Sequence, residues 1–79
     1  MPLYKVIDIA LNTYRKEPIS AIYENKNSFI VTYGMPDFTI TLGLPIICIS
    51  KLTNKISYIE ITDFFNILDN YKVVYKVSI

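Results

Sequence analysis

The chain has 79 residues, of which 52% are hydrophobic, and its eight basic and seven acidic side chains leave a formal net charge of +1. A chain of this length is expected to form one small domain, residues 1–79, around a single core. The lysines are scattered along the sequence, which argues against a nucleic-acid-binding stripe, and the near-neutral charge argues against an acidic mimic of nucleic acid.

The sequence contains no histidine and a single cysteine, Cys48. It therefore cannot form an internal disulfide, and it lacks the ligands of the common zinc sites. It also lacks the usual general base and the Ser–His or Cys–His pairs of nucleophilic catalysis. Cys48 lies in an apolar run and is expected to pack in the core. We predict no enzyme activity, no metal and no cofactor.

The first ten residues, MPLYKVIDIA, lack the hydrophobic region and cleavage site of a secretory signal. The longest apolar run surrounds Pro45 and is much shorter than the roughly 20 residues of a membrane-spanning helix. We therefore expect a soluble, cytoplasmic protein that makes no membrane contact.

The first predicted element is a helix over residues 3–14. Its apolar residues recur at spacings of three and four, which places them on one helical face: Leu3, Val6, Ile7, Ala10, Leu11 and Tyr14. Pro18 ends the pattern, because proline lacks the amide hydrogen that a helix needs.

After Pro18 the hydrophobic period changes to two, which is typical of strands. We predict strands over 19–24, 29–33 and 38–42. The segment 43–61, GLPIICISKLTNKISYIEI, predicts a hairpin, because the apolar strand 46–49 is followed by a polar turn and by the alternating strand 56–61.

Two further elements complete the chain. A short helical turn is predicted over residues 62–68, with Thr62 as its cap and Asp63 near its positive end. Three apolar side chains would pack this turn against the sheet: Phe64, Phe65 and Leu68. Residues 71–79 alternate as a last strand.

One helix followed by closely connected strands predicts an α+β fold, since short connections join antiparallel strands. The N-terminal helix would pack on one face of a predominantly antiparallel sheet of five or six strands, with the short helical turn before the last strand. The opposite face would be left open in a two-layer arrangement. The alternation assigns a mixed set of residues to it: Ile30, Thr32, Thr39, Thr41, Cys48, Tyr58, Glu60, Val74 and Lys76.

A face of tyrosine, threonine and separate aliphatic residues is typical of a contact surface. The same residue types also have high strand propensity, so an ordinary solvated face is the alternative interpretation. On the contact interpretation we predict five protein-binding residues: Ile30, Tyr58, Glu60, Val74 and Lys76.

The stretch GLPIICISKLTNKISYI resembles an element of short α+β bacterial immunity proteins of polymorphic toxin systems. In that group a glycine and a proline precede an apolar strand, a lysine, a turn and a second strand, and the helix over 4–14 and the stretch NSFIVTYG also fit. Phe29 stands where a tryptophan is expected, and Asn54 replaces the turn glycine, although asparagine accepts the left-handed conformation as well.

This resemblance implies a cytoplasmic, non-catalytic protein that neutralises a cognate toxin domain by stoichiometric binding. Two alternatives stay open. One is a self-associating structural or adaptor domain, a homodimer in which open faces or edge strands pair. The other is a phage or mobile-element inhibitor of a host defence enzyme.

Overall fold

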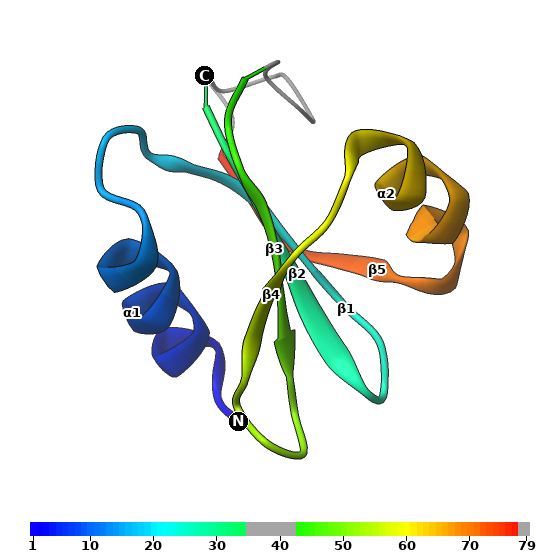
Figure 1. Cartoon of the computed structure of the whole chain (residues 1–79). Helices are drawn as coiled ribbons and strands as arrows, with labels where there is room; N and C mark the ends of the chain where they lie inside the picture. The colour runs from blue at the N-terminus through cyan, green and yellow to red at the C-terminus, as the bar shows by residue number, and fades with distance from the viewer. Residues whose placement is uncertain (35–42, 78–79) are drawn as a thin grey trace.

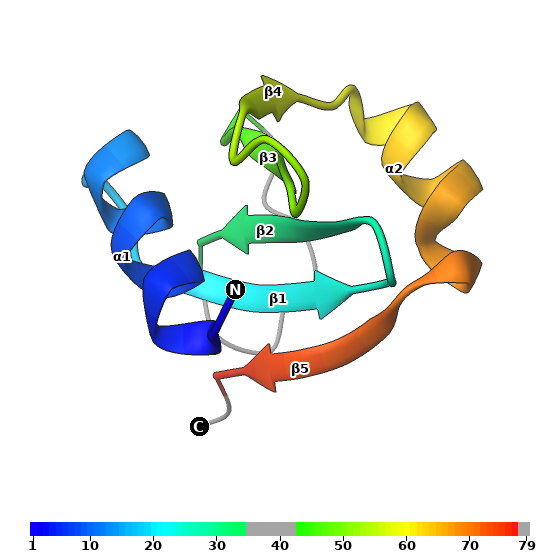
Figure 2. The same cartoon turned by 90° about the horizontal axis from the view of Figure 1, so that it is seen from below.

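A five-stranded antiparallel sheet forms the centre of the molecule, with one helix on each of its faces (Figures 1 and 2). The computed structural model describes residues 1–34 and 43–77. Its elements, in chain order, are α1 (Leu3–Thr13), β1 (Ile19–Glu24), β2 (Ser28–Tyr33), β3 (Ile46–Ser50), β4 (Ile56–Tyr58), α2 (Ile61–Ile67), the 3-10 turn η1 (Leu68–Asn70) and β5 (Lys72–Lys76).

The predicted α+β class is confirmed, including the short helix before the last strand. The predicted strand over 38–42 lies outside the described residues.

Helix α1 packs on the sheet through the apolar stripe that its sequence predicts. Val6 and Ala10, one helical turn apart, are completely buried, and Leu11 lies at the margin of the stripe and is exposed. The helix ends as the amide of Tyr14 bonds the Ala10 carbonyl at 3.1 Å. The Tyr33 hydroxyl donates a 2.7 Å hydrogen bond to the same carbonyl, so the end of α1 is fastened to β2.

The strand order is β4-β3-β2-β1-β5. Two hairpins supply β1–β2 and β3–β4, and the predicted hairpin of the segment 43–61 is confirmed in its first strand and turn. Asn25 builds the first turn, because its side-chain oxygen accepts from the amides of Asn27 and Ser28 at 2.8 and 2.9 Å. Asn54 occupies the left-handed region in the second, with φ 61°.

Strand β5 pairs with β1, at the edge opposite β4. The chain must therefore cross the sheet after β4, and α2 makes that crossing over the face away from α1 (Figure 2). Phe64 on α2 is completely buried, and its ring meets that of Tyr23 edge-to-face at 5.5 Å. Both faces of the sheet are consequently covered over the central strands.

The sheet thus separates two apolar cores. The core on the α1 side consists of Val6, Ala10, Ile19, Ile22, Phe29, Val31, Tyr33, Ile47 and Ile49. The core on the α2 side consists of Ala21, Tyr23, Ile30, Ile46 and Phe64, with Cys48 packed against it as expected. The predicted two-layer arrangement with an open face is wrong, because α2 forms a third layer.

The second strand of the 43–61 hairpin is shorter than predicted. Pairing stops at Tyr58, and Ile59 and Ile61 turn into the core on the α2 side. Burying these two side chains requires the chain to leave the sheet, so Glu60 precedes the helix and Ile61 begins it. The predicted Thr62 cap is therefore wrong, and Phe65 is exposed rather than packed on the sheet.

Candidate protein-binding surface at the β4 edge

The five residues predicted to bind a protein do not share one surface. Ile30 is completely buried beneath α2, so its predicted place on an open face is wrong. Val74 is half-buried and packs against the core on the α1 side. It is the extra residue of β5 where the register shifts between Ile22 and Tyr23, and such a bulge turns a side chain out of the alternation.

Tyr58 and Lys76 are both exposed, but they lie at opposite edges of the sheet. Four strand spacings separate β4 from β5, a distance of roughly 19 Å. Tyr58 pairs with Ile47, whose side chain belongs to the core on the α1 side. Paired residues share a face, so Tyr58 lies on the α1 side rather than on the predicted opposite side. Of the predicted set, Tyr58 and Glu60 are the two residues that are exposed near the β4 edge.

Strand β4 exposes a short apolar edge. All three of its residues are exposed, none is charged, and Tyr58 and Ile56 have 70% and 39% of their surface accessible. Ile56 pairs with Ile49, which places it on the same side of the sheet as Tyr58. Sequence reasoning missed Ile56, because the alternating pattern does not reveal whether a strand lies at an edge or in the centre.

The backbone of β4 faces outward at the same two residues. Two hydrogen bonds show which residues face β3. The Ser50 amide donates to the Lys55 carbonyl at 3.0 Å, and the Ile59 amide donates to the Ile46 carbonyl at 2.9 Å. Hydrogen-bonded and non-bonded pairs alternate along an antiparallel ladder, so Ser57 also bonds toward β3. The amides and carbonyls of Ile56 and Tyr58 therefore point to the outer edge of the sheet.

The other edge strand is better protected. Lysines occupy both ends of β5, Lys72 and Lys76, and its extra residue interrupts the regular ladder. Edge lysines and bulges discourage pairing with another strand. Val73, which is 54% accessible, is the exposed apolar residue between them. The two edges differ in how readily they accept a further strand.

Tyr58 also lies near Tyr33, the buried tyrosine whose hydroxyl bonds to the end of α1. Burial raises the pKa of Tyr33 to about 12, and Tyr58 acts in the same direction. The Tyr33 hydroxyl is therefore neutral over the physiological range and serves as a hydrogen-bond donor to Ala10. The rings of Tyr14 and Tyr33, 5.0 Å apart, complete this aromatic contact under the helix.

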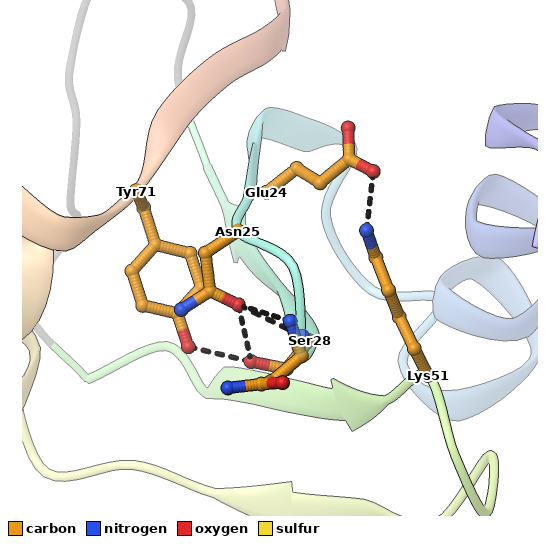
Figure 3. Close-up of polar contacts among 6 residues, drawn as sticks. Glu24, Asn25, Ser28, Lys51 and Tyr71 are labelled. Carbon is orange, nitrogen blue, oxygen red and sulfur yellow. Dashed lines mark hydrogen bonds and ion pairs between the residues drawn. The ribbon is translucent and has the colours of Figure 1, made fainter.

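A depression of about 460 Å³, lined by polar side chains, lies at the end of the sheet where β1 turns into β2. Lys51 pairs with Glu24 at 2.6 Å (Figure 3), and its ammonium stands 4.9 Å from the ring centre of Phe29. The hydroxyls of Ser28 and Tyr71 lie 2.5 Å apart. These contacts tie the β3–β4 loop and η1 to the first turn, and we assign them a structural role.

Within the described ranges no cluster of three or more potential ligand side chains is placed to hold a metal ion. Over the same residues, no helix has the length and apolar character needed to cross a bilayer. No protein-family model, curated protein or solved structure matches the chain. The function is therefore argued from the β4 edge and from the resemblance of the hairpin.

Proposed function

We propose that the chain is a non-catalytic protein-binding module that binds its partner at the β4 edge. The observation that carries this proposal is the coincidence of two exposed apolar side chains, Ile56 and Tyr58, with outward-pointing backbone groups at the same residues. Tyrosine is enriched among the residues that dominate binding energy at interfaces. An edge strand also offers main-chain hydrogen bonds to a partner.

The class of partner follows from the resemblance to immunity proteins. The segment that carries the resemblance is the β3–β4 hairpin, and this hairpin presents Tyr58 and holds Asn54 in the left-handed conformation. We propose that the partner is a bacterial toxin domain, which this chain neutralises in the cytoplasm by stoichiometric binding. Glu60, exposed two residues after the end of the edge strand, would make a charged contact at the rim of the interface.

Co-expression with a toxin-domain gene that neighbours the gene for this chain tests the proposal. The pair should co-purify in equal amounts, and the chain should relieve growth arrest by the toxin. Tyr58→Ala should weaken binding at least tenfold, because it removes a central aromatic side chain. Tyr4→Ala is the matched control, since Tyr4 on α1 is 69% accessible and its loss should leave binding unchanged.

If the pair neither co-purifies nor restores growth, the immunity proposal is wrong. If Tyr4→Ala and Tyr58→Ala weaken binding equally, the partner does not bind at the β4 edge.

A further inference from the structure

We infer that the β4 edge of the free protein pairs with the β4 edge of a second copy, forming an antiparallel dimer centred on Ser57. This inference rests on the surface of the proposed function, because the second copy would occupy the edge to which the partner binds. In Figure 2, β4 lies at one edge of the sheet with α1 and α2 on either side, and β5 lies at the other edge. A two-fold axis through Ser57 would join two five-stranded sheets into one.

The backbone of β4 is self-complementary in this register. When Ser57 faces Ser57 of the second copy, Ile56 of each chain faces Tyr58 of the other. These are the residues whose amides and carbonyls point outward, so each such pair can exchange two backbone hydrogen bonds. A shift by one residue would place inward-pointing groups at the contact and remove these bonds.

The side chains agree with the same register. Ile56 and Tyr58 lie on the α1 side in both copies, so each Ile56 would pack on a Tyr58 ring across the new strand pair. Aromatic and β-branched residues directly opposite each other are favourable partners in antiparallel sheets. Both side chains are exposed in the single chain, and the dimer would bury them.

The charge pattern of β4 is also compatible with this register. Lys55 of one chain faces Ile59 of the other, and the two Lys55 side chains stay apart by four residues along the ladder. The single charged residue of the segment 55–59 therefore meets an apolar residue and not a like charge. The backbone and side-chain matches favour a second copy over an unrelated strand.

In the dimer, the second copy competes with the partner for binding to the β4 edge. A partner that binds β4 must displace the second copy, so its apparent affinity should fall as the concentration of this protein rises above the dimer dissociation constant. In the absence of the partner, self-association would pair the exposed backbone groups of β4 and so protect this edge from unspecific pairing with other chains.

The first test measures the solution mass of the wild-type chain by sedimentation and light scattering over a range of concentrations. We expect a mass approaching twice 9.1 kDa as the concentration rises. Tyr58→Lys should give a monomer, because a lysine on an edge strand opposes pairing. Val73→Lys is the matched control: it adds the same charge to the exposed part of β5 and should leave the dimer intact. A wild-type monomer at millimolar concentration would overturn the inference.

The second test fixes the register by cross-linking. In Ser57→Cys the two new thiols would face each other with about 4.5 Å between α-carbons, a distance that accommodates a disulfide. Cys48 pairs with Ser57 within one chain, so the experiment uses a Cys48→Ala background. Oxidised glutathione should then yield a covalent dimer.

Ile56→Cys in the same background should not cross-link, because its two thiols would stand roughly 8 Å apart between α-carbons. Efficient cross-linking of Ile56→Cys but not of Ser57→Cys would overturn the register. The two proposals fail separately. A monomer that still neutralises the toxin retains the proposed function and loses the dimer, whereas a dimer without a toxin partner retains only the pairing.

Discussion

Tyr33 connects two layers of the molecule through a single side chain. Its ring packs against Tyr14, and its hydroxyl donates to the Ala10 carbonyl beneath α1. The same carbonyl also accepts from the Tyr14 amide, so it keeps one partner when the hydroxyl is removed. Tyr33→Phe should therefore lower the free energy of unfolding by only about 1 kcal/mol. Urea denaturation checks this value, with Tyr4→Phe on the exposed side of α1 as the control that should change nothing.

The same phenol should make the protein sensitive to alkali. The pKa of Tyr33 is raised to about 12 by burial, above the value near 10 of an unfolded tyrosine. Above pH 10 the unfolded chain loses this proton while the folded chain keeps it, so stability should fall between about pH 10 and 12. Tyr33→Phe should show a shallower fall over that window in urea denaturation. Equal pH dependence of the two proteins would contradict this assignment.

Asn54 shows how far a single residue can be predicted from the sequence. Its turn role follows from its type and position, and the structure confirms a left-handed conformation with φ 61°. Asn54→Gly should leave the free energy of unfolding unchanged within about 0.5 kcal/mol, whereas Asn54→Ala should lower it by about 1 kcal/mol, because a β-carbon strains this backbone. Thermal unfolding of the two variants measures the difference. The role of Tyr33 could not be predicted in this way, because it depends on where α1 lies.

At the level of elements, the sequence predicts α1, β1, β2 and β3 nearly to their ends, since each has a clear period and a turn signal. The sequence predicts that α2 exists, but it does not show which face of the sheet α2 covers. A seven-residue helix is too short for its periodicity to show which face it buries, so the sequence could not reveal that it covers the second face of the sheet. That omission explains why the sequence predicts Ile30 on an open surface, whereas the structure buries it.

Helix α2 is anchored by Phe64, and its neighbour offers a matched comparison. Phe64 is completely buried in the core that contains Tyr23 and Ile30, whereas Phe65 is exposed and its ring meets that of Phe64 edge-to-face. Phe64→Ala should lower the free energy of unfolding by about 3–5 kcal/mol, and Phe65→Ala by less than about 1 kcal/mol. Phe64→Leu provides a milder variant if Phe64→Ala does not fold. Equal effects at positions 64 and 65 would mean that α2 does not pack on the sheet as described.

On the scale of the whole molecule, the pairing of β5 with β1 decides which strands form the edges. Local patterns predict hairpins, but the β1–β5 pair joins strands nearly fifty residues apart and carries no local signal. Consequently the sequence predicted Tyr58 and Lys76 on one surface, whereas the topology places them at opposite edges. Tyr58 and Glu60 are the two predicted residues that the fold leaves exposed near one edge of the sheet.

The β4 pairing also makes a prediction about stability. If two copies associate through β4 only when folded, dimerisation stabilises the folded state by mass action, and the urea midpoint of the wild-type chain should rise with protein concentration. Tyr58→Lys should abolish this concentration dependence while keeping the midpoint of the dilute wild-type chain, because Tyr58 is exposed in the single chain and contributes little to its core. Val73→Lys should retain the concentration dependence. A midpoint that is independent of concentration from micromolar to millimolar wild-type protein would show that the unfolding monomer accounts for all of the stability and that the β4 edge does not pair.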